Sequence, residues 1–343
     1  MSSPAPHPSA VSNEFRTAFE RFAGERRVLR FDEFVELALF DNEVGYYRSH
    51  RTRIGRSAGT DFFTAMSANP VFGHLVAAAI VSLLGKFDPA SMTFVEIGAE
   101  PGRSVFENIP HPFRSAKTLR VKDPLLIEGP SVVFSNELLD AQPFRRFRRS
   151  EDQWIELGVQ ITDGGLIETC LGPASESWLP LAAEDGYLFD APRRAADLAL
   201  DIARQDWVGL FVAIDYGKSL EELTQALPGG TARAYRSHRQ SNDLLATPGE
   251  QDLTCHVCWD WIAESLKMHR FLSPRIESQE AFFVHHAGAA LEKIAGTDST
   301  LRSTAKQALM QLLHPANMGQ KFQVLHALRT RQERPCTAGP LLV

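Results

Sequence analysis

Three short runs of apolar residues stand out along the chain, and each ends in acidic residues or glycine. They are MTFVEIGA (92–99), SVVFSNELLDA (131–141) and WVGLFVAIDYG (207–217). A continuous apolar run of this length is typical of a strand buried on both faces of a parallel sheet. Ligands bind such sheets at the carboxyl ends of the strands. The pattern therefore predicts an α/β fold with its site where these runs end.

Apolar residues at helical spacing predict the helices that surround this sheet. They occur over residues 13–23, 31–40, 70–84 and 191–205, and in LRSTAKQALMQLLHP (301–315). Alternating patterns predict a polar hairpin over 154–170 and later, antiparallel strands at TARAYRSH (231–238) and ESQEAFFVHH (277–286).

Composition and charge narrow the class of protein. The 343 residues are 44% hydrophobic and carry a net charge of -6, so no broad basic field is available for nucleic acid. The most basic cluster, FRRFRR (144–149), predicts a solvated or partner-facing strand edge. No apolar run reaches the ~18 residues of a membrane span, and the Pro/Ser-rich start does not resemble a signal peptide. We therefore expect a cytoplasmic protein with reduced cysteines.

The first candidate site is the turn after the first strand, FVEIGAEPGRS (94–104). Glycines there let backbone N–H groups approach a ligand, and the start of a following helix would attract anionic groups. Glu96 could receive the ammonium group of S-adenosyl-L-methionine (SAM). NAD fits less well, because Gly98 and Gly102 do not complete a G-x-G-x-x-G pattern. The alternative is an ordinary strand-to-helix turn.

The second candidate site is SNELLDAQPF (135–144), where the second strand ends. Glu137 and Asp140 could together hold a cation, and a guanidinium fork would match two carboxylates. The alternative is a helix start with Asn136 as its cap. That alternative leaves unexplained why Glu96 and Asp215 lie at the same edge of the sheet.

Two further motifs invite a metal site, and the pattern favours neither. CHVC (255–258) lacks a second cysteine pair, so we expect a strand that runs into a helix, with the thiols as small apolar fillers. His285 and His286 are adjacent, and in a strand they would face opposite sides. We therefore predict no metal ligands.

Several segments together resemble the MidA-like class I SAM-dependent methyltransferases. This family includes a mitochondrial protein arginine methyltransferase needed for assembly of respiratory complex I. The segments run in family order over nearly the whole chain: GYY (45–47), IGRSAGTDFFT (54–64), NPVFGHLVA (69–77), VEIGAEPG (95–102), SNELLDAQPF (135–144), IDYG (214–217), RAYRSHR (233–239), PGEQDLTCHV (248–257) and HPANMGQKFQVL (314–325).

The resemblance implies a Rossmann-like class I methyltransferase sheet of seven strands, with an N-terminal helical cap and additional family-specific elements. We expect a disordered tail at 1–12, the cap at 13–75, the core with inserted and C-terminal elements at 76–330, and a tail at 331–343. The implied cofactor is SAM. The implied partner is a protein substrate, and the chain could pair as a homodimer.

The resemblance also assigns site residues. The cofactor would be bound by a closing loop, by the turn after the first strand and by the loop after the second: Asp61, Phe62, Thr64, Glu96, Gly98, Ala99, Gly102 and Asn136. The catalytic groups would be Glu137, Asp140 and Asp215.

Two departures from the family pattern bear on activity. Glu100 stands where the family commonly has a glycine-rich turn, and its carboxylate would repel that of SAM if it pointed inward. The segment between Gly102 and Ser135 is short, with room for about two turns of helix and a strand at 117–121. Asp123 is then the one nearby candidate for the acid that binds the ribose.

These observations predict a SAM-dependent methyltransferase that acts on a protein side chain, with arginine as the best-matching acceptor. A degenerate methyltransferase that serves as a binding or assembly module is the alternative from another class. A small-molecule methyltransferase is a third hypothesis, which differs from the first only in its acceptor.

Overall fold

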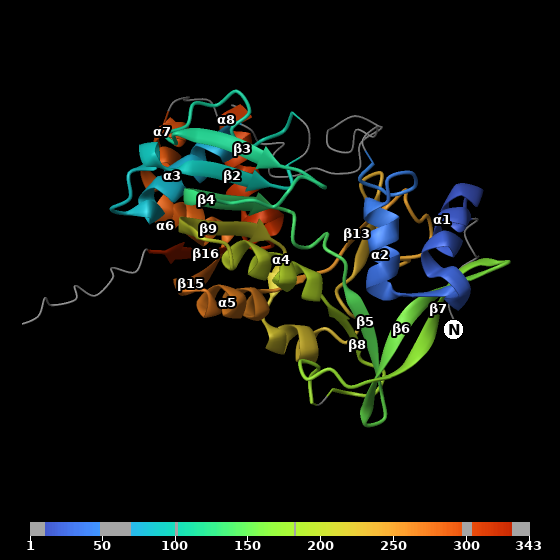
Figure 1. Cartoon of the computed structure of the whole chain (residues 1–343). Helices are drawn as coiled ribbons and strands as arrows, with labels where there is room; N and C mark the ends of the chain where they lie inside the picture. Colours follow the sequence, from blue (N-terminus) through green and yellow to red (C-terminus); the bar gives the residue numbers. More distant parts are fainter. Residues whose placement is uncertain (1–10, 49–69, 100–101, 182, 297–303, 331–343) are drawn as a thin grey trace, which may run out of the picture.

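The computed structural model describes residues 11–48, 70–99, 102–181, 183–296 and 304–330. A central sheet with helices on both faces forms one part of the molecule, and a lobe of antiparallel strands forms the other (Figure 1). Among the described helices, none has the length and apolar character that crossing a membrane requires.

The central sheet contains the three strands that the apolar runs predict. Its order is β15-β16-β9-β4-β2-β3, and β3, β2, β4 and β9 are parallel, whereas β16 is antiparallel to both of its neighbours. The bounds are Thr93–Ile97 (β2), Ser115–Leu119 (β3), Gly129–Asn136 (β4), Trp207–Asp215 (β9), Phe271–Ser278 (β15) and Gln323–Arg329 (β16). The α/β fold and its parallel core are confirmed.

Helices cover both faces of this sheet. One face packs against α3, Val71–Leu84, together with α6, α7 and α8 (Gln279–His286, Gly288–Gly296 and Thr304–Leu313). The other face packs against α4, Arg193–Ala203, and α5, Trp259–Met268. Helix α3 spans the domain boundary expected at residue 75, and the division of the chain into domains stays a prediction.

The strand predicted over 277–286 is wrong for most of its length. β15 ends at Ser278, whose Oγ accepts a hydrogen bond from the backbone N–H of Ala281 at 3.2 Å and so caps α6. A serine cap followed by an acid in the first turn, here Glu280, is a helix-start signal. The cap therefore places His285 and His286 in the last turn of a helix.

The crossover after β2 also differs from the prediction. The described residues 102–114 form turns and contain no helix, and only residues 120–128 connect β3 to β4. Nine residues are too few for a helical crossover to a further strand. The described part of the central sheet accordingly has six strands and not the seven expected.

The second lobe is built on the sheet β1-β6-β5-β8, with β7 paired to β6. The hairpin predicted over 154–170 corresponds to β6 and β7. Helices α1 and α2 match the helices predicted over 13–23 and 31–40, and they share a core with this sheet and with the small sheet β12-β11-β13. The bounds are Asn13–Ala23 (α1), Val28–Arg30 (β1), Phe31–Phe40 (α2), Arg145–Ser150 (β5), Gln153–Thr162 (β6), Gly165–Ala174 (β7), Leu188–Ala191 (β8), Arg233–Arg236 (β11), Arg239–Ser241 (β12) and Asp252–Thr254 (β13).

The prediction for FRRFRR as a strand edge is wrong. β5 lies between β6 and β8, and three of its arginines, Arg145, Arg146 and Arg148, pair with acids. Arg146 is buried and lies 2.9 Å from Asp190, whereas Arg145 Nε donates to Glu156 at 2.7 Å. The basic cluster is therefore an internal ion-pair network and not a free surface.

The strand-to-helix interpretation of CHVC is confirmed. β14, Val257–Cys258, pairs with β10, Gly217–Lys218, and leads directly into α5. Both thiols are buried, and burial raises the pKa of Cys258 to about 12. Short helical turns at Gly24–Arg26, Pro89–Ser91, Glu222–Ala226 and Pro315–Gly319 complete the described elements.

Candidate active site

The predicted site residues meet at the carboxyl ends of β2, β4 and β9. In the parallel registers, Ile97 lies opposite Ser135, and Asn136 lies opposite Ile214. The turn after β2, the loop after β4 and Asp215 at the end of β9 therefore share one edge of the sheet. This is the edge at which α/β sheets bind ligands.

Glu96 shapes the turn after β2. Its buried carboxylate accepts a hydrogen bond from the Ser104 hydroxyl at 2.6 Å and from the Val105 backbone N–H at 2.9 Å. Burial raises the pKa of this carboxyl to about 6, although both hydrogen bonds act to lower it. The turn thus holds Glu96, and direct contact with a ligand ammonium stays a prediction.

The glycines of this turn have conformations that other residues rarely adopt. Gly98 has φ +87° and Gly102 has φ +69°. The Gly98 N–H donates to the Leu119 carbonyl at 2.8 Å, and a Cβ on Gly98 would lie 2.6 Å from Leu138 Cδ1. Ala99 follows and is partly exposed, whereas Glu100 lies outside the described residues. The glycine-dependent backbone path of a cofactor turn is therefore present.

The loop after β4 contains a strained residue and an unsatisfied acceptor. Glu137 has φ +51°, and its Oε1 accepts a hydrogen bond from Asn136 Nδ2 at 3.0 Å. Asn136 Oδ1 is buried and has no hydrogen-bond partner in the described structure. Strain of this kind costs ~1–3 kcal/mol, and it clusters at functional sites. An N–H donor of a bound ligand would satisfy the orphaned oxygen.

Asp215 anchors this loop. Its Oδ2 accepts hydrogen bonds from the backbone N–H groups of Leu138, Leu139 and Asp140 at 2.8–3.3 Å, and its Oδ1 accepts from Tyr216 at 2.8 Å. Asp215 is fully buried, and burial raises its pKa to about 6 against the effect of these hydrogen bonds. The structure gives Asp215 a positioning role, and a catalytic role stays a prediction.

Asp140 is buried beside Asp215. Burial, the charge of Asp215 and then that of Asp252 raise the pKa of Asp140 well above its ordinary value. Each of these two carboxyl groups disfavours ionisation of the other, because like charges repel in a buried site.

Three tyrosines and one acid that the sequence pattern did not single out, Tyr47, Tyr216, Tyr235 and Asp252, complete the site. Tyr47 Oη donates to the buried Asp252 at 3.0 Å. Burial and then the charges of Glu137 and Asp140 raise the pKa of Tyr216, and burial and Asp140 raise that of Tyr235. The missed residues belong to segments already quoted for the family resemblance, which was the one signal that could have indicated them.

The arrangement is chemically suited to a cation. Carboxylates attract positive charge, and neutral tyrosine hydroxyls add hydrogen-bond partners without repelling it. Several carboxyl groups meet here: Glu137, Asp140, Asp215 and Asp252. Such a site disfavours an anionic substrate.

Comparisons with known proteins agree with this architecture. A family model described as "Putative S-adenosyl-L-methionine-dependent methyltransferase" matches residues 116–274. A Burkholderia thailandensis crystal structure, described as a "likely methyl transferase" bound to S-adenosyl-homocysteine, aligns with a TM-score of 0.78 and 23% identity over 96% of this chain and 95% of that one. At this identity the structural likeness establishes the fold.

These matches support the MidA-like family of SAM-dependent methyltransferases as the group that this chain resembles.

Relatives of this MidA-like protein include mitochondrial proteins named protein arginine methyltransferase NDUFAF7 or its homologue. The Drosophila melanogaster protein is 22% identical over 373 aligned positions, which cover 85% of this chain and 80% of the relative. The Caenorhabditis elegans protein is 26% identical over 151 residues, or 41% of this chain. That match spans 34% of the worm protein, and the match to the Danio rerio protein spans 48% of its length.

SAM is the cofactor of this family, as the sequence analysis expected. Asp123, the predicted ribose acid, is exposed just after β3 and accepts a hydrogen bond from the Arg120 N–H at 2.8 Å. It lies at the same edge as Gly98, because β3 and β2 are parallel neighbours. The predicted closing-loop residues Asp61, Phe62 and Thr64 lie outside the described residues.

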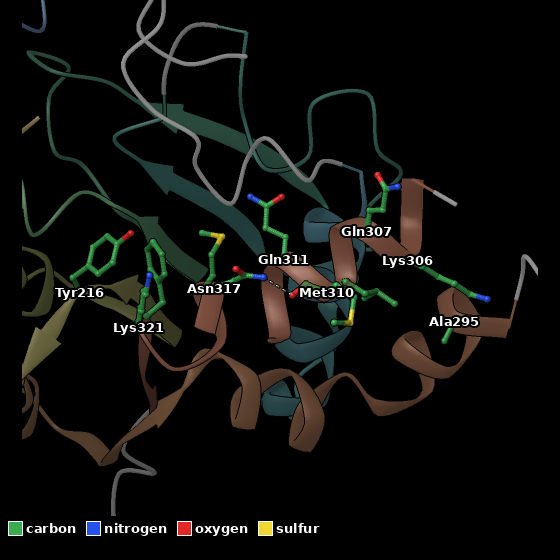
Figure 2. A pocket seen from close by; sticks show the side chains of 11 residues that line it. Tyr216, Ala295, Lys306, Gln307, Met310, Gln311, Asn317 and Lys321 are labelled. Carbon is green, nitrogen blue, oxygen red and sulfur yellow. Dashed lines mark hydrogen bonds between the residues drawn. The ribbon is translucent and has the colours of Figure 1, made fainter. Parts of the chain in front are cut away.

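A pocket of about 790 Å³ lies beside the acidic edge of this MidA-like fold. Figure 2 shows Tyr216 at one end of the pocket and the side chains of α8, including Met310 and Gln311, along it. The Tyr216 and Phe322 rings lie 4.0 Å apart between centroids. Tyr216 thus belongs to both the acidic site and the pocket, which connects the two.

Proposed function

We propose that this methyltransferase transfers a methyl group from SAM to a side-chain nitrogen of a protein, with arginine as the acceptor. The observation that carries the proposal is the group of carboxyls and neutral tyrosines at the carboxyl ends of β4 and β9. A guanidinium is cationic at any working pH, and its planar fork fits paired carboxyl oxygens. The names of the distant relatives support the same acceptor.

The residues fit SAM at the neighbouring turn. Gly98 and Gly102 give the turn its open backbone path, and the orphaned Asn136 Oδ1 offers an acceptor at the same edge. Asp123 would hold the ribose hydroxyls after releasing or sharing its bond to the Arg120 N–H. Bound there, SAM supplies an electrophilic methyl group on a sulfonium.

The residues of this chain would contribute to methyl transfer by orienting the acceptor and by stabilising its charge. Glu137 would grip the guanidinium and orient one nitrogen for in-line attack. As the new N–C bond forms, the S–C bond breaks, S-adenosyl-homocysteine leaves, and the nitrogen sheds a proton to a carboxylate of the site. Asp215 would keep Glu137 in place through the N–H groups of the loop that it binds.

A binding or assembly module is the second candidate function. The observation in its favour is the turn after β2, where the described residues 102–109 contain no helix. A helix start would have added positive potential for the carboxylate of SAM. Such a module would have the methyltransferase fold but would not transfer methyl groups.

Methyl transfer from labelled SAM to arginine-rich and lysine-rich peptides tests the acceptor. We expect label on arginine, located by mass spectrometry, and little on matched lysine peptides. Transfer to lysine alone would contradict the arginine proposal. SAM binding without transfer to any peptide or protein extract would favour the binding module.

A further inference from the structure

A cluster of two histidines and a carboxylate is formed by residues of α6, β15 and β16, the elements labelled in Figure 1. Glu277 is near the end of β15, His286 ends α6, and His326 lies within β16. His326 pairs with Val212, and Val324, opposite Glu277, pairs with Ile214. Residues two apart share a face, so Glu277 and His326 both face the helical layer that contains α6.

The geometry of the three side chains suits a metal ion. Glu277 Oε2 lies 3.0 Å from His286 Nε2 and 3.5 Å from His326 Nε2, and all three ligand atoms lie within 4.8 Å of one another. Bonds of ~2.0–2.1 Å to a tetrahedral zinc ion place ligand atoms roughly 3.4 Å apart. The cluster therefore has ligand spacing without rearrangement of the backbone.

The second observation is the buried, unpartnered nitrogen of His326. The residue is only 6% exposed, and its Nε2 has no hydrogen-bond partner in the described structure. The 3.5 Å separation from Glu277 does not supply one. A buried polar atom without a partner costs ~1–3 kcal/mol, and a cation bound to its lone pair would remove that cost.

The surrounding residues fix the orientation of this cluster. His285 Nδ1 lies 2.7 Å from Glu277 Oε1, which leaves Oε2 directed at the other two histidines. The Phe282 ring lies 5.3 Å from that of His286 and 5.8 Å from that of His326, and it forms an apolar wall. Outer contacts of this kind orient the ligands in known metal sites.

We propose that Glu277, His286 and His326 form a binding site for zinc or a similar divalent transition metal. Two imidazoles and one carboxylate are suitable ligands for such ions, and a water molecule would complete the tetrahedron. Glu277 and His286 are partly exposed, with 18% and 21% of their side chains accessible, so the ion has a route of entry. The bound metal would tie α6 to β15 and β16.

The proposed site differs from the expectation that this region contains no metal ligands. That expectation assumed a strand in which neighbouring histidines diverge. In the helix, His286 lies near His326 of β16, and His285 instead contacts the second carboxylate oxygen of Glu277. The pairing partner lies 40 residues further along the chain, so the local sequence could not indicate it.

Zinc titration of the full chain, after removal of metal with a chelator, tests the proposal. We expect one zinc ion per chain, a raised melting temperature with zinc, and absorption bands of tetrahedral cobalt when Co²⁺ replaces zinc. His286→Ala and Glu277→Gln should each weaken zinc binding by more than ~10–100-fold. That range is typical for the loss of a residue that only hydrogen-bonds to a metal ligand. His326→Ala is less suitable because the residue is buried.

Two control variants exclude nonspecific binding. His74→Ala removes an exposed histidine on α3, and Cys170→Ser removes an exposed thiol. Both should bind zinc as the unmodified chain does. The proposal is overturned if the chain does not bind zinc, or if His286→Ala and Glu277→Gln bind it unchanged. Either result would identify the cluster as a hydrogen-bonded group alone.

Discussion

The carboxyl groups near the site are of two kinds. Some accept hydrogen bonds from backbone N–H groups of a loop, and others lie at the ligand-binding edge of the sheet. Glu96 and Asp215 are buried, and each accepts hydrogen bonds from the loop beside it. Glu137 instead occupies a strained backbone position with φ +51°. The two kinds of carboxyl should respond differently to loss of charge, in stability for the first and in catalysis for the second.

Glu137→Gln should lower methyl transfer by ~10²-fold or more, because it removes a charge that orients and accepts a proton from the acceptor. SAM affinity should stay close to that of the unmodified chain. Glu264→Gln, an exposed change on α5, is the matched control. Steady-state kinetics and SAM titration on the three proteins check this. An unchanged kcat in Glu137→Gln would remove the residue from the mechanism.

Glu96 should make the fold less stable as the pH rises. Its pKa is about 6 in the folded chain against an ordinary value of 4.5, so the folded state binds more protons between these values. The free energy of unfolding therefore falls between about pH 4.5 and 6, by ~1–2 kcal/mol from this group.

Urea unfolding of the unmodified chain and of Glu96→Gln at pH 4.5 and pH 7 measures this effect. The variant lacks the titrating group, so its stability should fall less over this interval. An identical pH dependence in both proteins would show that Glu96 does not carry the raised pKa.

At the scale of elements, ion pairs across strands hold the second lobe together. Arg146 on β5 pairs with Asp190 on β8, and Asp190 also accepts the backbone N–H groups of Thr231 and Ala232. One buried carboxylate thus links β5 and β8 to the segment that leads into β11. Asp252 and Tyr235 of the site belong to this lobe. The ion pairs that stabilise the lobe therefore also hold these two residues at the acidic edge.

Arg146→Ala should lower the free energy of unfolding by ~3–5 kcal/mol, because it leaves the Asp190 carboxylate buried without its cation. The matched control is Arg148→Ala on the same strand. Arg148 is 43% exposed and pairs with Glu168, so its loss should cost at most ~1 kcal/mol. Equal effects of the two substitutions in urea unfolding would contradict the buried network.

At the scale of the whole molecule, the parallel core could be predicted because β4 and β9 are buried along most of their length. Continuous apolar runs record that burial directly. The site edge followed from the acids at the strand ends. The features that the sequence did not predict depend on partners far along the chain. Arg146 meets Asp190 from 44 residues away, and Asp252 joins the site from the small third sheet.

The errors in the crossover and in 277–286 have a local cause. Residues 103–109 leave too little length before the prolines at 110 and 112 to form a stable helix. In the other segment, the apolar residues fit either structure, and the cap at Ser278 decides for the helix. Neither error affected the prediction that the site lies at the carboxyl ends of the parallel strands.

Isothermal titration with SAM tests most directly whether this edge binds the family cofactor. We predict binding of one SAM per chain, with at least tenfold weaker binding by Gly98→Val, in which a side chain would meet Leu138 at a backbone φ of +87°. Circular dichroism should confirm that the variant folds. An absence of SAM binding by the unmodified chain up to about 1 mM, the upper end of usual substrate affinities, would contradict the account.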